Sequence, residues 1–516
     1  MSSQDSRIVL RAVLAPLALI LLASVAAAQP APGAAPAASP SAPTAQPAAP
    51  ASTELPKSST QAALEEKLHA MRSGKGLTSD EAARRSVKNS PLIEAKRHAI
   101  EGVDGQLDQT RYSFWPKVKL GASYTHLSPV HPKFGGGPLP TDPVGIAALQ
   151  AITPLFASLT KIPTESWSLD GQLSVPLSDY LLRVSHALSG ASLARDAAVY
   201  DRKATYASVD RDARVAYYGW VRSQAQELIA AQSLEQATGH QKDAGNAFQA
   251  GLVSKADVLA TQAAVKNAEL FVERAKNQTA LARLGLEVSM GDAPDQKYEV
   301  GEDVFGPSPE LSSLPSSAAA FREAANQRME LKSLGAAAQA SREQAALTQI
   351  GDYPRLDGNA GMAYANPNQR FFPLQQQWNL SWQVGVALSW TPTDIGVSES
   401  AKGIANAKAA ELEAQRRAVS NGLRLEIEQA LRAAEEARYT IDVSGHGLAA
   451  ADESYRVRRE LFRAGRATLV EVTDAETELT RARLELADAF VNSRIALAQL
   501  RHALGRDAEP ARQSSP

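Results

Sequence analysis

Four short segments of the chain alternate between apolar and polar positions, which is the period of a half-buried strand. They cover residues 117–127, 166–177, 355–365 and 378–391. The polar parity carries Ser, Gln, Asp and Asn, so we predict strands with one apolar and one wetted face. In the second and fourth segments the apolar positions include Trp378 and the residues predicted to face lipid, which are Trp167, Leu169, Leu173, Val175, Leu380, Trp382, Val384, Val386, Leu388 and Trp390.

Aromatic residues near the ends of an apolar face are typical of strands in a transmembrane barrel, whose outer side meets lipid. An ordinary sheet packed on a soluble core explains the alternation equally well. Four strands cannot close a membrane barrel, because the smallest have about eight. If these apolar residues face lipid, several chains must pool their strands, and three chains would supply twelve.

The rest of the chain has the period of a helix. Two segments without proline, residues 181–246 and 396–463, are each long enough for a helix of about 100 Å at about 1.5 Å per residue. Shorter helical segments cover residues 78–113, 254–290, 317–350 and 468–504. We therefore predict a mixed but mostly α fold in which two short helices, stacked end to end, pair with each long one.

The chain contains a long internal duplication. Residues 248–258 reappear as residues 462–472, and the same offset relates Gly291 to Gly505. A repeat of this length indicates a duplicated half-molecule rather than a solenoid. We assign the first repeat to residues 76–291, a linker that is partly packed at best to 292–316, the second repeat to 317–505 and a disordered C-terminal tail to 506–516.

The N-terminal residues predict secretion. Residues 1–28 have the basic start, apolar run and small-residue end of a signal peptide. Residues 29–75 begin with a stretch rich in Pro and Ala, and the whole segment is predicted to be a disordered tail. The chain has no cysteine, and its eight histidines show no metal-ligand spacing, so no metal or cofactor is expected. The net charge of −2 does not favour nucleic-acid binding.

Both copies of the duplicated motif are predicted to be turns between a long helix and its shorter partner. Gly251 and Gly465 stand where a left-handed residue would end the long helix. Ser254 with Asp257, and Thr468 with Glu471, have the spacing of a capping box that starts the next helix. Asp474 follows one turn later and is not needed for the cap.

The duplication, the two strands in each half and the paired helices resemble the TolC-like outer-membrane factor family over about residues 76–505. The most specific pieces are the turn motifs at 250–258 and 464–475 and the sequence Val-Pro-Leu-Ser-Asp at 175–179. The resemblance implies a homotrimer with a twelve-stranded β-barrel in the outer membrane of a Gram-negative bacterium and an α-barrel in the periplasm. It also implies a passive exit duct for efflux or type I secretion, working with a periplasmic adaptor and an inner-membrane transporter.

The resemblance also assigns roles to residues of the turns. Glu471 and Asp474 fall on positions whose carboxylates ring the periplasmic aperture, and an exposed surface role is the alternative for Asp474. In the family an arginine latches the gate at the position of Ala467, and whether Arg466 replaces it stays open. The predicted adaptor-docking turns contain Gly251, Leu252, Val253, Gly465 and Arg466.

Two other functions would account for part of this pattern. A soluble periplasmic coiled-coil adaptor or scaffold would keep the helices and use the strands as a small sheet. The polar residues on the second face of the strands argue against burial of that face. An enzyme is not expected, because the sequence shows no nucleophile with a base, and residues 396–400 lack the nucleophile-elbow pattern.

Overall fold

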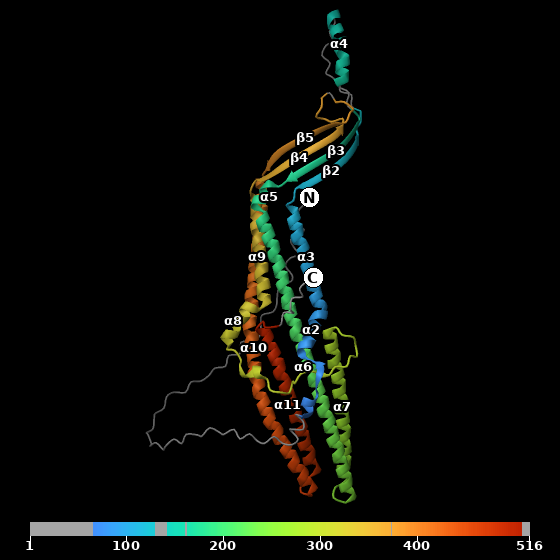
Figure 1. Cartoon of the computed structure of the whole chain (residues 1–516), viewed down its shortest axis with the longest axis vertical. Helices are drawn as coiled ribbons and strands as arrows, with labels where there is room; N and C mark the ends of the chain where they lie inside the picture. Colours follow the sequence, from blue (N-terminus) through green and yellow to red (C-terminus); the bar gives the residue numbers. More distant parts are fainter. Residues whose placement is uncertain (1–65, 130–141, 160–162, 373, 508–516) are drawn as a thin grey trace, which may run out of the picture. The chain divides into compact units, whose positions relative to one another are not determined.

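A computed structural model describes residues 66–129, 142–159, 163–372 and 374–507, most of which are helical (Figure 1). The helices are α2 (Ser79–Asn89), α3 (Pro91–Ser113), α4 (Pro143–Leu159), α5 (Leu177–Leu182), α6 (Val184–Gln249), α7 (Lys255–Met290), α8 (Ser317–Gln327), α9 (Met329–Gln349), α10 (Ile395–Arg463) and α11 (Leu469–Ala503). The strands are β1 (Arg72–Leu77), β2 (Lys117–His126), β3 (Glu165–Val175), β4 (Arg355–Asn366) and β5 (Asn379–Ser389). Short 3₁₀ helices cover Pro309–Ser312, Ile350–Asp352 and Pro392–Asp394.

The four alternating segments form one antiparallel sheet in the order β2-β3-β4-β5 (Figure 1). The register keeps the apolar parity on one face across all four strands. Leu169 pairs with Ala122 on β2 and with Tyr364 on β4, and Tyr364 pairs in turn with Leu380 on β5. A one-residue slip at any of these pairings would have moved one strand's apolar set to the opposite face.

The apolar face of the sheet is exposed. Leu120, Trp382 and Val384 are 81%, 70% and 73% exposed, whereas residues of a packed core lie below about a tenth. Since the described residues do not cover this face, the sheet does not pack its apolar side on a hydrophobic core within the chain.

The helices pair as the lengths predict. α6 packs against α7 and α10 packs against α11, while α6 also contacts α3 and α9, and α10 contacts α9. Each long helix is thus accompanied by two shorter helices in succession. The main core joins both halves, since Tyr217 and Trp220 of α6 are buried in the same cluster as Leu479 and Leu486 of α11.

The duplication is also visible where each repeat ends. Gly291 after α7 has φ +67° and leaves room for Asn89 at the α2–α3 junction, whose Cβ would lie 2.8 Å from an added side chain. Gly505 after α11 has φ +73° and packs in the same way on Gln327 at the α8–α9 junction. Glycine is required at both places by the backbone conformation and by the close approach.

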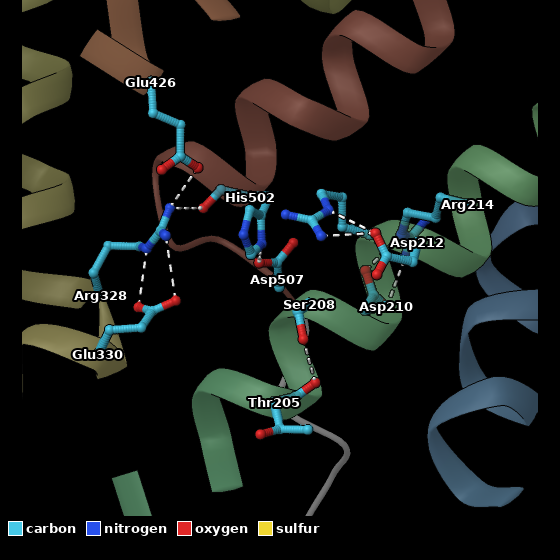
Figure 2. A network of polar contacts seen from close by, with 11 residues as sticks. Thr205, Ser208, Asp210, Asp212, Arg214, Arg328, Glu330, Glu426, His502 and Asp507 are labelled. Carbon is cyan, nitrogen blue, oxygen red and sulfur yellow. Dashed lines mark hydrogen bonds and ion pairs between the residues drawn. The ribbon is translucent and has the colours of Figure 1, made fainter. Parts of the chain in front are cut away.

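An arginine strengthens the second of these junctions. Arg328 lies between Glu330 and Glu426 in Figure 2, and its guanidinium donates to both carboxylates at 2.8–3.2 Å. It also donates to the backbone carbonyl of His502 at 3.3 Å. Arg328 therefore links the α8–α9 junction to α10 and to the end of α11.

Two predicted unstructured segments contain ordered residues. The prediction of a tail through residue 75 is wrong at its end, because Leu68 is 2% exposed and β1 begins at Arg72. The linker 292–316 is well packed rather than partly packed, since Val300 and Val304 are buried. Leu77 and Gly301 donate backbone hydrogen bonds between β1 and this linker, so each segment orders the other.

Two further predictions differ from the structure. The glycine triplet at 135–137, Pro138 and other helix breakers predict a long loop over residues 127–164, but residues 143–159 form α4. The C-terminal tail was expected to begin at residue 506, but the side chain of Asp507 is only 5% exposed, and its carboxylate lies 2.8 Å from Nδ1 of His502. The signal peptide, most of the N-terminal tail, the glycine triplet at 135–137 and residues 508–516 lie outside the described residues.

Candidate functional site

The first hairpin turn, between α6 and α7, ends a helix with a left-handed glycine. Gly251 has φ +74° and donates to the carbonyl of Phe248 at 2.9 Å, and Leu252 donates to that of Ala247 at 2.8 Å. These two bonds satisfy carbonyl groups that the last helical turn leaves free.

The second hairpin turn, between α10 and α11, has the same backbone. Gly465 has φ +69° and donates to Phe462 at 2.9 Å, while Arg466 donates to Leu461 at 2.8 Å. The duplicated sequence therefore specifies the same turn twice.

Each returning helix begins with a capping box. The amide of Asp257 donates to the hydroxyl of Ser254, and the Asp257 carboxylate accepts from the Ser254 amide at 2.8 Å. The Ser254 hydroxyl holds the pKa of Asp257 below its usual value. Thr468 and Glu471 repeat the arrangement at α11, with 3.0 Å between the threonine hydroxyl and the carboxylate. The carboxylates of Asp257 and Glu471 thus act as caps.

Asp474 lies one turn beyond Glu471 and is exposed, between the buried residues Val472 and Ala475. Within the described part of the chain its carboxylate has no hydrogen bond or ion pair. Of the two predicted aperture acids, Asp474 is therefore the one with an uncommitted charge.

The other turn residues differ between the two hairpins. Leu252 is 79% exposed at the first turn, with Val253 half-buried beside it. At the second turn Arg466 is exposed and Ala467 is half-buried. The first turn therefore presents an apolar side chain and the second a basic one.

Sequence reasoning missed the contacts that connect the two hairpins near their turns. Arg463 of α10 reaches Asp243 of α6, with 3.9 Å between Nη2 and Oδ2. His240 of α6 lies 2.9 Å from the hydroxyl of Tyr455 on α10. Neither contact has a sequence signal, because the partners are more than 200 residues apart.

A buried acid lies beside this connection. Glu476 of α11 is 8% exposed, and its carboxylate is 3.5 Å from Nε2 of His240. Burial raises the pKa of Glu476 to about 7, and burial lowers the pKa of His240. Both shifts disfavour the charged forms, so burial weakens the ion pair that the 3.5 Å separation would otherwise allow.

A model for the outer membrane efflux protein family matches residues 83–292 and 320–506. These segments make up most of the chain, and each coincides closely with one of the two repeats. The chain belongs to the outer membrane efflux protein family. A comparison with curated proteins gave no match.

Solved structures of outer membrane efflux channels have the same fold. CusC matches with a TM-score of 0.68 at 14% identity, over 83% of this chain and 92% of that one. VceC of Vibrio cholerae matches with 0.67 at 16%, over 83% and 96%. The CmeC outer membrane channel of Campylobacter jejuni matches with 0.64 at 15%, over 83% and 85%.

Family membership settles the class of function and the location. The protein is an outer-membrane efflux channel of a Gram-negative bacterium, with its helical part in the periplasm, and not a soluble periplasmic scaffold. The family consists of passive channels that are trimeric and work with periplasmic adaptors and inner-membrane pumps. Among the described helices, none has both the length and the apolar character needed to cross a membrane.

Proposed function

We propose that three copies of this efflux protein close a twelve-stranded barrel and form the passive exit duct of a tripartite efflux or type I secretion system. The observation that carries the proposal is the exposed apolar face that runs across β2, β3, β4 and β5. Extended apolar patches are rare on soluble monomers. Contact with the lipid of a bilayer would remove this apolar face from water.

The edges of the sheet support pooling of strands. β2 and β5 are the outer strands, and each leaves backbone groups unpaired along one side. Inside a bilayer such groups cost several kcal/mol each, so the sheet must close. Because four antiparallel strands alternate in direction, β5 of one copy lies antiparallel to β2 of the next, and copies extend the sheet without a break in pattern.

Asp474 is the proposed gating or selectivity residue at the periplasmic end. Three copies would bring three uncommitted carboxylates to one narrow mouth, where their combined field attracts cations and their repulsion resists closure. Glu471 belongs to the same turn, but its carboxylate is held at the cap by Thr468. An exposed surface acid without a role in conduction is the competing account of Asp474.

The hairpin turns are the proposed docking sites of the periplasmic adaptor. Leu252 supplies an exposed apolar side chain on the first turn, and Arg466 supplies a charge on the second. The glycines Gly251 and Gly465 fix the backbone on which these side chains stand. A rigid turn loses little entropy when a partner binds it.

The stoichiometry is tested by native mass spectrometry of protein extracted with detergent from outer membranes. We expect a particle of three chains that lack residues 1–28. A monomer recovered from the soluble periplasmic fraction would overturn the trimeric duct.

The role of Asp474 is tested by single-channel recording in planar lipid bilayers. Asp474→Asn is expected to reduce cation preference and block by multivalent cations, while Asp474→Glu keeps both. The same selectivity and the same conductance in Asp474→Asn and the wild type would leave Asp474 as a surface acid.

A further inference from the structure

Residues 368–370, which follow β4, lie over the wetted face of the sheet. Asn368 in this segment is only 4% exposed. Its side-chain amide donates to the carbonyl of Asn379 at 3.0 Å and to the hydroxyl of Ser381 at 2.9 Å. Ser381 stands at one of the polar positions of β5, so its side chain is on the wetted face. Ala365 of β4 is on the same face and is 9% exposed. The segment therefore covers polar-parity positions and leaves the apolar face free.

Arg370 extends this contact further along β5. Its Nη1 donates to the carbonyl of Trp382 at 2.7 Å, and its Nη2 donates to Oε1 of Gln383 at 2.8 Å. Its own amide donates to Oδ1 of Asn368 at 3.0 Å. Both ends of the residue are thus held, so the guanidinium has a defined place on the wetted face.

The sheet leaves room for this arrangement. Gln383 pairs with Gly361 on β4, and an added Cβ at Gly361 would lie 3.4 Å from Cγ of Gln383. Gln383 therefore extends across the glycine and stays on the polar face, where it accepts from Arg370.

The charge of Arg370 is not compensated by its partners. All its acceptors are neutral, and its side chain is exposed. Over the described ranges no carboxylate forms an ion pair with it, unlike Arg355 on the same face, which pairs with Asp357 at 3.1 Å. A guanidinium is permanently charged, so it places a fixed positive charge where the wetted face meets solvent.

We propose that Arg370 is a charge-selectivity residue of the channel, which favours anionic over cationic solutes in the strand-built part of the pore. The inference rests on the proposed trimer, in which the wetted face lines the lumen and three guanidiniums surround it. Fixed charges of one sign in a confined aqueous passage raise the local concentration of the opposite ion. β4 follows α9 and β5 precedes α10, so the connection carrying Arg370 lies at the end of the sheet away from those helices.

The other charges on this face do not cancel Arg370. Lys117 and Lys119 add positive charge on β2, while Asp170 on β3 accepts from Ser168 at 2.6 Å. Asp170 is the acid nearest the middle of the strands, and three copies of it would oppose the arginines only in part.

The test is the reversal potential across planar bilayers with a KCl gradient, for the wild type, Arg370→Gln and the charge-preserving control Arg370→Lys. We expect Arg370→Gln to lower the chloride-to-potassium permeability ratio by at least about two-fold, the size that Coulomb interaction across about 8 Å of water gives for one charge. Arg370→Lys should stay near the wild type. A ratio that is unchanged in Arg370→Gln overturns the inference.

Labelling separates the charge of Arg370 from any effect on folding. Because the chain has no cysteine, Arg370→Cys provides one reactive thiol per chain. A cationic methanethiosulfonate reagent should restore the wild-type ratio in an open channel, and an anionic reagent should lower it further. Equal effects of the two reagents would overturn the inference. A wild type that forms no channels would instead overturn the proposed trimeric duct, so the two failures are distinguishable.

Discussion

Nη1 of Arg328 lies 2.8 Å from Oε1 of Glu426, and this contact joins the junction between α8 and α9 to the long helix α10. Arg328 is 12% exposed at its side chain, and it also contacts Glu330 and the end of α11. Burial acts to raise the pKa of Glu330, but Arg328 holds it below its usual value. One guanidinium thus stabilises a joint between three helical segments.

Loss of Arg328 should destabilise this joint. We expect Arg328→Ala to cost about 2–3 kcal/mol, because charge-assisted hydrogen bonds are lost and two carboxylates are left without their cation. Arg328→Lys, which keeps the charge but not the two-sided geometry, should cost less. Thermal unfolding in detergent at pH 7.5 measures the difference, and equal midpoints for Arg328→Ala and the wild type would contradict it.

The capping box of α11 gives a local prediction. Thr468→Ala should cost about 1 kcal/mol, since the first turn of the helix loses its side-chain acceptor. Hydrogen exchange at the amides of residues 469–472 should become faster. Thr477→Ala, more than two turns further along the same helix, is the control. Equal exchange in both variants would mean that the cap does not hold the turn.

The sequence predicted the parts of the fold that have a local or periodic signal. Alternation located the four strands, the lengths of proline-free segments located α6 and α10, and glycine with Ser or Thr located the turns. The capping roles of Asp257 and Glu471 were also predictable, because the residues of a capping box lie within four consecutive positions.

Features that depend on distant pairing were not predictable in this way. The pairing of β1 with the linker joins residues such as Leu77 and Gly301, which no period connects. Asn368 and Arg370 stand in a stretch without alternation, and their place became clear only from their contacts with β5. The joint made by Arg328 likewise depends on residues from three helices.

Stability should depend on pH through Glu476. Its pKa in the folded protein is raised to about 7, so the folded state binds the proton more tightly than the unfolded state, and stability is lost as pH rises from about 4.5 through 7. Arg483 of α11 acts on Glu476 directly, and His240 of α6 lies 3.5 Å from its carboxylate. Tyr455 of α10 is affected by Glu476 in turn, Asp243 and Arg459 act on His240, and Asp452 acts on Arg483.

Replacement of Glu476 isolates this contribution. Glu476→Gln should match the wild type near pH 5 and be more stable by about 2–3 kcal/mol near pH 8.5, because the amide never has to ionise in a buried place. Unfolding midpoints of both proteins across this range measure the gap. A gap that is constant with pH would show that Glu476 titrates normally.

Two neighbouring positions on β5 test which side of the sheet meets lipid. Val386→Arg places a charge on the apolar face and should cost up to about 2–4 kcal/mol in the membrane, whereas Ala387→Arg places it on the wetted face and should cost little. The measurement is the yield of heat-modifiable trimer in outer-membrane fractions. Equal yields for the two variants would contradict the assignment of the faces.

The two hairpin turns share one backbone but carry different side chains. In an assembly of three chains they would form a ring of six tips that is nearly six-fold in shape and only three-fold in chemistry, alternating Leu252 with Arg466. A partner with six equivalent copies would meet two kinds of contact, one apolar and one charged. High salt would then weaken every second contact and leave the others in place.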